Sequence, residues 1–378
     1  MGSNVYAELG VRRVLNAATT LTALGRTVLP EEVLRAMAGA SRSCVSMEEL
    51  HDAAGRRLAQ LTRNDAAYVT SGCAAAITLA TLAAITHGDP ATIARIPGDE
   101  SLARTVVMHR AHRIPYDRAI ELGGGHILEI GNVIQTFEWE LEAALDQSVA
   151  AVFWVAGGHL PQSALTLDRA VAIAHSRGVP VIVDAAAQLP PVENLWRYTV
   201  ESGADLALFS GGKALQGPQA SGLMVGSAKL IDAARSNGAP HQRFARALKA
   251  GKEEICGLVA AVERYLALDH AVLAKSWSET VDAWVAGLSD VKGVATRRVA
   301  TNEAAQPVPR LEVTFERDDL DATRVAESLW DGDPRVAVLV ADAKLFATPD
   351  TLATDDDAAL VLTRLRAALG EGSAANVE

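Results

Sequence analysis

The sequence predicts an α/β protein with a mostly parallel sheet flanked by helices, followed by a smaller α+β domain. The middle of the chain alternates short β-rich runs with Ala-rich helical stretches, which is the order of consecutive βαβ units. Several of the β-rich runs are apolar almost throughout, as expected for strands that helices cover on both faces. A chain of 378 residues also exceeds one ordinary core, so two domains are expected.

The predicted strands and helices succeed one another between residues 48 and 226. The strands are short apolar runs at 105–109, 126–130, 150–155, 179–184, 205–210 and 222–226. The helical patterns lie at 48–61, 74–85, 139–145, 167–176 and 195–202. Ligands of open α/β sheets bind at the carboxyl ends of the strands, so the loops after these strands are the places to search for a site.

The texture of the sequence changes after a long helical pattern that starts near Gly251 and runs through Leu266. Beyond it, two runs have the composition of strands and one that of a terminal helix; they are 310–315, 336–340 and 358–369. We therefore expect an N-terminal arm at 1–30 that packs elsewhere, a large domain at 31–250 and a small domain at 251–378.

The composition argues against several classes of protein. A formal net charge of -11 and a pI of about 5.4 disfavour nucleic acid or an anionic membrane as a general partner. Cys44, Cys73 and Cys256 form no CxxC pair, so neither a disulfide framework nor a metal site is expected. The N-terminus has no apolar signal core, and the longest apolar run, near 73–86, is too short to span a bilayer. A cytoplasmic protein is expected.

A lysine follows an apolar strand and three small residues, in the run Leu206-Ala207-Leu208-Phe209-Ser210-Gly211-Gly212-Lys213. Desolvation in an apolar pocket disfavours the ammonium ion, and the resulting neutral amine is what a Schiff base needs. The glycines let the backbone approach a flat ring closely. The alternative is a surface lysine in a glycine turn, which the motif alone does not exclude.

An acid ends another candidate strand, Val179-Pro180-Val181-Ile182-Val183-Asp184, and three alanines follow it. A carboxylate at a buried strand end is costly unless a cation pairs with it. The pyridinium nitrogen of pyridoxal phosphate is such a partner, and Ala186 is small enough to lie against the ring. The alternative role of Asp184 is a helix N-cap. The spacing from Asp184 to Lys213 leaves room for one helix and one strand, which predicts that both residues end adjacent strands.

A turn of small residues precedes an Ala-rich helix in the run Tyr68-Val69-Thr70-Ser71-Gly72-Cys73-Ala74-Ala75. The free amide groups and the dipole at a helix start bind phosphate, so Ser71, Gly72 and Cys73 are candidate ligands of a cofactor phosphate. An ordinary capped helix is the alternative. The order along the chain is phosphate loop, acid and lysine, each after a strand, and this order favours one cofactor site over three unrelated features.

Short stretches between residues 14 and 254 carry a resemblance to a known family. They are 14–18 with 24–26, 46–50, 70–76, 183–191, 209–213, 217–222 and 249–254. The most specific are Ser210-Gly211-Gly212-Lys213 and Gly217-Pro218-Gln219-Ala220. On these stretches the chain resembles the fold-type I pyridoxal-phosphate enzymes, in the branch that holds selenocysteine synthase and D-glucosaminate-6-phosphate ammonia-lyase. The last third of the chain has only a general similarity to the family and no specific matching stretch.

The resemblance implies a seven-stranded sheet, a smaller C-terminal domain, and pyridoxal 5'-phosphate held as a Schiff base on Lys213 with Asp184 at its ring nitrogen. Further residues are implied around the cofactor; they are Ser71, Gly72, Cys73, His112, Ala186 and Ser210. It also implies active sites shared between subunits of a homodimer or larger ring. We expect no counterpart of the tRNA-binding N-terminal extension of bacterial selenocysteine synthase. Together with the acidic composition, this argues against selenium transfer to tRNA.

Five polar residues are weaker candidates. His112 follows a strand where an imidazole could stack on the ring, although a solvated basic loop accounts for it equally well. Gln188 and Gln219 are candidates for the pocket lining. Lys252 could hold an anionic substrate group, and Arg26, on a polar arm, could bind a carboxylate or phosphate through two parallel hydrogen bonds. A solvated helix start and a loose N-terminal loop are the alternatives for these two.

The predicted function is that of a lyase which removes ammonia or water from an amino acid or amino sugar acid. The reaction starts with abstraction of the α-proton, for which Lys213 is the expected base. A racemase or epimerase shares this first step, and an aminotransferase is a further candidate. A selenocysteine-synthase-like transferase and a binding protein on an inactive enzyme fold are weaker alternatives. The presence of both Asp184 and Lys213 argues against the binding protein.

Overall fold

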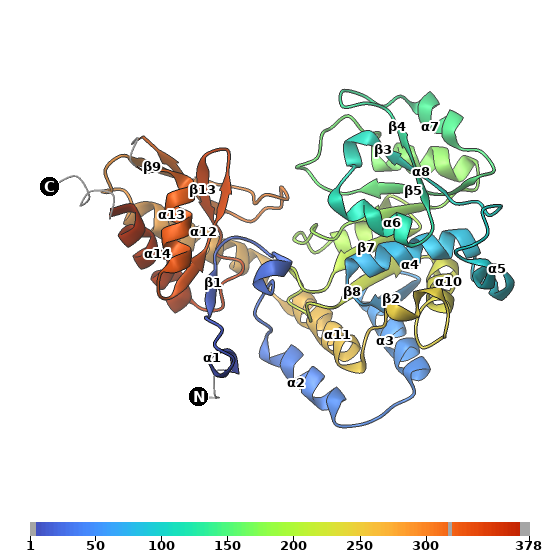
Figure 1. The fold of residues 1–378 in the computed structure, drawn as a ribbon, viewed down its shortest axis with the longest axis horizontal. Coiled ribbons are helices and arrows are strands. Elements are labelled where there is room, and N and C mark those ends of the chain that lie inside the picture. Colours follow the sequence, from blue (N-terminus) through green and yellow to red (C-terminus); the bar gives the residue numbers. More distant parts are fainter. Residues whose placement is uncertain (1–4, 317–319, 371–378) are drawn as a thin grey trace. The chain divides into compact units, whose positions relative to one another are not determined.

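The computed structural model describes residues 5–316 and 320–370, which form two compact units (Figure 1). The larger unit is Leu29–Ala267, and the smaller unit combines the residues up to Val28 with those from Leu268 onward. Among the described helices, no segment has both the length and the hydropathy of a membrane-spanning helix.

The larger unit is built on a seven-stranded sheet with the strand order β2-β8-β7-β6-β5-β3-β4. The strands are β2 (Ala66–Thr70), β3 (Thr105–His109), β4 (His126–Ile130), β5 (Val149–Val155), β6 (Val181–Asp184), β7 (Leu206–Ser210) and β8 (Gly222–Gly226). β8 runs antiparallel to both of its neighbours, and the other neighbouring strands pair in parallel. The predicted mostly parallel, seven-stranded sheet is confirmed.

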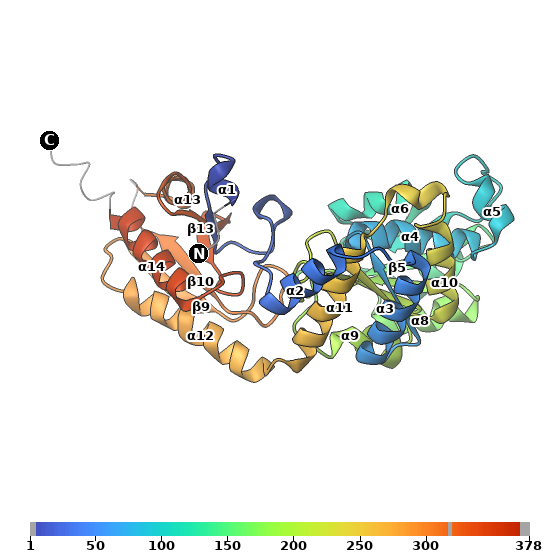
Figure 2. The same ribbon diagram turned by 90° about the horizontal axis from the view of Figure 1, so that it is seen from below.

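Helices cover both faces of this sheet. They are α2 (Glu31–Ser41), α3 (Met47–Thr62), α4 (Cys73–Thr86), α5 (Pro90–Arg95), α6 (Arg118–Leu122), α7 (Glu138–Ala144), α8 (Leu167–Ser176), α9 (Asn194–Trp196), α10 (Ala228–Asn237) and α11 (Lys252–Ala267). Figure 2 shows α4 and α8 on opposite sides of the strands, and both pack on β5. α4 also contacts α6 and α10, so it is surrounded by protein, which explains its apolar residues on all sides.

The smaller unit has an antiparallel four-stranded sheet with the order β12-β13-β10-β9. Its elements are α1 (Val5–Glu8), β1 (Val14–Asn16), α12 (His270–Gly287), β9 (Val294–Val299), β10 (Arg310–Phe315), α13 (Ala322–Asp331), β11 (Arg335–Ala337), β12 (Leu339–Ala341), β13 (Lys344–Ala347) and α14 (Asp355–Gly370). Its core includes Trp284, Val313 and Leu365. The expected strand at 336–340 is two short strands, β11 and β12, which belong to different sheets.

The boundaries of the two compact units differ from the boundaries of the expected domains. The helix expected to open the small domain is α11, and it packs on α2 and α3 of the larger unit through buried residues such as Leu258 and Val262. The middle of the expected arm contains strand β1, which pairs in parallel with β11, and Leu15 is buried in the core of the smaller unit. Local composition did not indicate this, because the partner strand lies more than 300 residues away.

We predict that Phe153→Ala lowers the free energy of unfolding of the larger unit by about 3–5 kcal/mol, because the fully buried ring leaves a cavity between sheet and helices. Urea unfolding followed by circular dichroism measures this change. Phe137→Ala is the matched control: that ring is 46% exposed, and its removal should cost far less. Equal losses in the two variants would contradict the packing described for β5.

Candidate active site

The carboxyl ends of several strands of the larger unit meet at one edge of the sheet. Gly222, at the start of β8, is paired with both Thr70 at the end of β2 and Ser210 at the end of β7. Asp184, the last residue of β6, is paired with Leu208 of β7 and Val155 of β5. The loops that the sequence singled out for phosphate, acid and lysine therefore begin at this common edge.

Asp184 is a buried carboxylate, with 4% of its surface exposed. Its Oδ1 accepts a hydrogen bond from the amide of Ala186 at 3.0 Å and one from the thiol of Cys73 at 3.8 Å. Burial raises the pKa of Asp184, while the Ala186 amide, the charge of Lys213 and the Cys73 thiol lower it. Burial is the largest of these effects, so the pKa of Asp184 stays above its usual value; Lys213 lies close enough to act on it electrostatically, and a further cationic partner would stabilise the ionised form.

The loop that carries Lys213 is fixed by the segment between β7 and β8. The amide of Gly211 donates to the carbonyl of Ser221 at 2.9 Å, and the amide of Gly217 donates to the carbonyl of Gly211 at 2.8 Å. A Cβ on Gly211 would lie 2.1 Å from Ser221 Oγ and 2.8 Å from Leu258, so only glycine fits there. The two most specific stretches of the sequence are therefore joined by a backbone hydrogen bond. Lys213, at the end of the first stretch, is half-buried.

Gly72 precedes the first turn of α4 with φ 99° and ψ 163°, a conformation that is almost restricted to glycine. Gly222 packs directly behind it, because a Cβ on Gly222 would lie 2.6 Å from the carbonyl carbon of Gly72. The residue requirement at Gly72 comes from its backbone angle, since a Cβ there would meet nothing within 4 Å. A helix start approached by backbone alone, with Ser71 partly exposed beside it, is a suitable phosphate site.

His112 is buried next to Val155 of β5, the residue that is paired with Asp184. Its Nδ1 accepts a hydrogen bond from the amide of Val155 at 3.2 Å, which leaves the proton of the neutral ring on Nε2. Burial, and then the neighbouring His109, lower the pKa of His112 to about 3. The ring also contacts the edge of Trp154, with 4.9 Å between centroids. A neutral flat ring of this kind can stack on an aromatic cofactor without adding charge.

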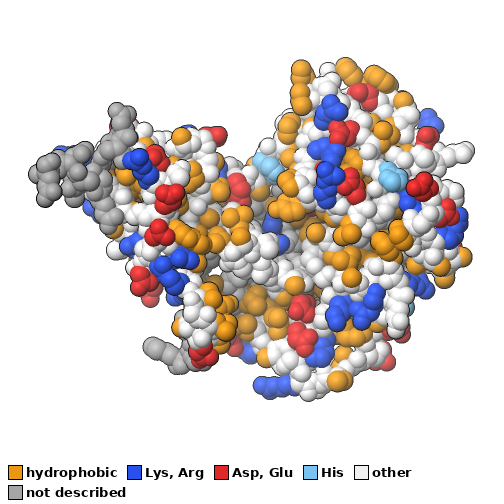
Figure 3. Space-filling model, viewed as in Figure 1, with side chains coloured by type: hydrophobic (Ala, Val, Ile, Leu, Met, Phe, Trp, Pro, Cys, Tyr) orange, Lys and Arg blue, Asp and Glu red, His pale blue; other side chains and the backbone are white. Residues whose placement is uncertain are grey.

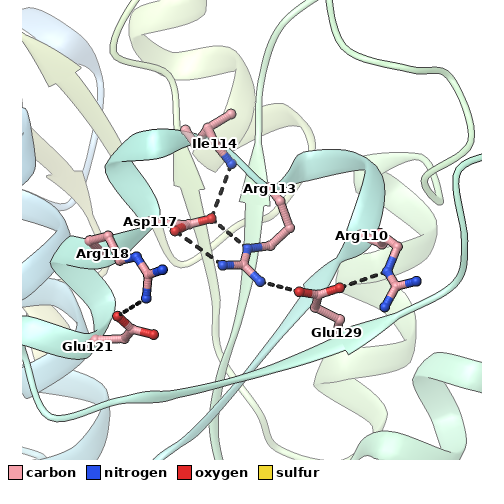
Figure 4. Close-up of polar contacts among 7 residues, drawn as sticks. All are labelled: Arg110, Arg113, Ile114, Asp117, Arg118, Glu121 and Glu129. Atoms are coloured by element: carbon pink, nitrogen blue, oxygen red, sulfur yellow. Dashed lines mark hydrogen bonds and ion pairs between the residues drawn. The ribbon is translucent and has the colours of Figure 1, made fainter.

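A network of ion pairs holds the loop on which His112 lies, and Figure 4 shows Arg113 at its centre. Arg113 Nε donates to Asp117 Oδ2 at 2.6 Å, and its Nη1 pairs with Glu129 of β4. Arg110 Nε donates to the other oxygen of Glu129 at 2.8 Å, which together with Arg113 holds the pKa of Glu129 below its usual range. The network fastens the loop to strand β4, so the position of His112 is set by the sheet.

The structure does not bring every candidate residue to this edge. Arg26 belongs to the smaller unit, where its Nη2 lies 3.3 Å from Thr22 Oγ1. Lys252 is engaged by the carbonyl of Ala40 at 2.8 Å and by Glu253, and Gln219 is exposed. Gln188 lies in the loop after Asp184, and its buried Nε2 has no hydrogen-bond partner among the described residues.

Two further residues lie beside the site without a role in the sequence predictions. His109 ends β3 fully buried, 5.1 Å from the His112 ring, and Trp154 of β5 contacts His112 from the other side. The pair of histidines at a strand end was a visible signal, but the sequence did not show that β3 and β5 are neighbours. Within the described residues, no cluster of His, Cys, Asp and Glu suits a metal ion.

The larger unit thus offers a buried carboxylate, a lysine, a neutral imidazole and a helix start at one edge. Comparison with known proteins gives full-length relatives. A D-glucosaminate-6-phosphate ammonia lyase of Salmonella typhimurium is 34% identical, over 97% of this chain and 98% of that protein. A 5'-C-glycyluridine monooxygenase-decarboxylase of Streptomyces is 32% identical, over 94% of this chain and 90% of that protein.

The solved structures agree with the sequence relatives. The structure of a D-glucosaminate-6-phosphate ammonia-lyase matches with a TM-score of 0.86 and 33% identity, over 99% of this chain and 100% of that one. A serine palmitoyltransferase of Sphingomonas wittichii, at 13% identity and a TM-score of 0.58 over 95% of this chain and 88% of that one, shows the fold alone. Residues 14–276 match the family described as SelA, L-seryl-tRNA selenium transferase. The chain therefore belongs to the SelA family and has the fold of the fold-type I pyridoxal-phosphate enzymes.

Proposed function

We propose that the protein is a pyridoxal-phosphate-dependent lyase that removes ammonia or water from an amino acid or amino sugar acid. The observation that carries this proposal is the buried Asp184 carboxylate within electrostatic reach of Lys213 at the carboxyl edge of the sheet. Pyridoxal phosphate, when bound, supplies a protonated ring that withdraws electrons from the α-carbon of an amino substrate. A cytoplasmic location belongs to the same proposal.

Each side chain at the edge has a task in this proposal. Lys213 Nζ would hold the cofactor and would be the base that takes the α-proton of the substrate. Asp184 would accept a hydrogen bond from the protonated ring nitrogen and so would stabilise the positively charged ring. His112 would contact one face of the ring and Ala186 is small enough for the other, while Ser210 ends the strand before Lys213.

The phosphate belongs at the start of α4, where Ser71, Gly72 and Cys73 present backbone amides. Gln188 is the favoured candidate for substrate binding, because its buried amide nitrogen still has a hydrogen bond to give within the part of the chain described here. Lys252 already contacts Ala40 and Glu253, which weakens the case for it as a substrate-binding residue. For Gln219, only its exposure supports a substrate-binding role.

A lyase is favoured over selenium transfer by the extent of the matches. The ammonia-lyase relative is 34% identical over 98% of its length, whereas selenium transferases of Alkaliphilus metalliredigens and Desulfovibrio desulfuricans are each 26% identical, over 64% and 84% of their lengths. In the face of the larger unit shown in Figure 3, Lys and Arg side chains lie among Asp and Glu side chains, which suits a small substrate better than tRNA. A racemase or aminotransferase remains an alternative, and the decarboxylase relative adds loss of carbon dioxide to the reactions worth testing.

We also propose a homodimer or larger ring in which neighbouring chains complete each site. In the smaller unit, Tyr6, Leu9 and Val11 are exposed, and Leu9 reaches 76% exposure. In the larger unit, Leu34 and Val45 are exposed near its N-terminal end. Exposed apolar side chains on each unit are typical of surfaces that another subunit covers. Arg26 is proposed to reach the substrate of a neighbouring subunit.

We predict that the protein with pyridoxal phosphate has a visible absorption band that Lys213→Ala abolishes, because Lys213 follows the strand end at which the cofactor is proposed to bind. Borohydride reduction followed by peptide mapping should place the label on Lys213. Lys229→Ala, at an exposed position on α10, is the control and should keep the band. A label on another lysine would show that the assignment is wrong.

We predict that Asp184→Ala and Asp184→Asn keep the fold but lower turnover by roughly 10²- to 10³-fold, since a neutral ring withdraws electrons poorly. Products are read by mass spectrometry on a panel of D- and L-amino acids and amino sugar phosphates. A 2-oxo acid formed without an amine acceptor identifies the lyase. Asp168→Asn, an exposed carboxylate on α8, is the control. Turnover near that of the unaltered protein in the Asp184 variants would remove Asp184 from the mechanism.

We predict that light scattering gives at least the mass of a dimer. Mixing inactive Lys213→Ala chains with inactive Arg26→Ala chains should then restore part of the activity, because some sites receive both intact residues. Mixing two preparations of Lys213→Ala is the control and restores nothing. If subunits exchange and activity does not return, the sites are not shared.

A further inference from the structure

Cys73 connects the two halves of the proposed cofactor site. It is the first residue of α4, directly after Gly72, so its backbone belongs to the helix start that faces the phosphate. Its side chain is buried, with 7% exposed, and Sγ lies 3.8 Å from Oδ1 of Asp184. This distance is within the reach of a thiol hydrogen bond, in which the neutral S–H donates to the carboxylate.

Asp184 accepts two hydrogen bonds on one of its two carboxylate oxygens. Both the Ala186 amide and the Cys73 thiol bind Oδ1, and neither of these bonds uses Oδ2. Two donors from different elements, one after β6 and one on α4, fix the rotation of the carboxylate about its Cβ–Cγ bond. Oδ2 is then the oxygen directed to a further donor, such as a ring N–H.

The thiol also differs from Lys213 in how it acts on the charge of Asp184. The titratable groups that act on this carboxylate are Lys213 and Cys73, and burial opposes both by raising its pKa. The effect of Lys213 exists only while its amine is protonated, and a lysine that binds a cofactor covalently or takes a proton spends part of the reaction neutral. The S–H donor persists in every protonation state of that lysine.

We propose that Cys73 is a positioning residue whose thiol orients the Asp184 carboxylate and remains as a hydrogen-bond donor to it while Lys213 is neutral. The proposal rests on the proposed function, since it assumes that Asp184 meets the cofactor ring. Cys73 thereby joins the phosphate loop to the acid, and a shift of the α4 start is transmitted to Asp184.

The contact itself is tested by infrared spectroscopy of the S–H stretch. The chain has three cysteines, so the changes Cys44→Ser and Cys256→Ser leave Cys73 as the single thiol. A hydrogen bond lowers the S–H frequency, and we expect the band to move up when Asp184→Ala is added to this background. An unchanged frequency would mean that the thiol does not bind Asp184, and the proposal would fail.

The role is tested by comparing Cys73→Ala with Cys73→Ser, which differ by one hydroxyl donor. We expect Cys73→Ala to lower kcat about fivefold, the size of one weak hydrogen bond to a charged group, and Cys73→Ser to restore it. Loss of a donor that lowers the pKa of Asp184 should also move the acid limb of the pH profile to higher pH. A nitrogen-15 NMR signal of the cofactor ring should shift toward the neutral form.

Cys256→Ala, a partly buried thiol on α11, is the matched control and should change neither the pH profile nor the ring signal. If Cys73→Ala lowers stability while both readouts stay unchanged, the thiol only packs and the proposal is wrong. Failure of the proposed function is distinguishable, because the unaltered protein would then lack the visible band of bound cofactor or would form no 2-oxo acid. The infrared comparison needs no cofactor and still reports the contact.

Discussion

A carboxylate buried at a strand end must be stabilised by its surroundings, and the rest of the site in the larger unit is arranged around that requirement. Asp184 accepts hydrogen bonds from the Ala186 amide in the turn after β6 and from the Cys73 thiol of α4. The charge of Lys213, in the loop after β7, also acts on it. These partners come from three separate elements, so the Asp184 carboxyl group is oriented only when the sheet and α4 are assembled. The buried carboxylate links folding of this unit to its chemistry.

Close backbone approach makes that assembly possible. Gly222 lies between the ends of β2 and β7 and directly behind Gly72, and Gly211 lies against Ser221 with no room for a Cβ. Each of these glycines removes a side chain where two segments touch. The result is a dense edge from which Cys73, Lys213 and Asp184 project into one small region. A larger residue at these positions would separate the loops and move the functional groups apart.

The same frame supports different reactions in its relatives. The matched proteins include an ammonia lyase, a monooxygenase-decarboxylase and selenium transferases, while the sheet and the order of its loops are common to the fold. The fold therefore fixes where the chemistry takes place, and the side chains around the substrate decide which bond breaks. In this chain, Gln188 and the loop of His112, which Arg113 fastens to β4, are the proposed counterparts of those side chains.

The sequence by itself determined the class of fold, most strands of the large sheet and the order of phosphate loop, acid and lysine, because these features are written in short contiguous runs. The strands 105–109, 126–130 and 222–226 agree with the structure residue for residue. Tertiary structure alone decided that β1 joins the C-terminal residues, that α11 stays with the larger unit, and that the Cys73 thiol meets Asp184. Those contacts join residues separated by many positions, and no local pattern of polarity or spacing records which distant segment fills the space beside a given side chain.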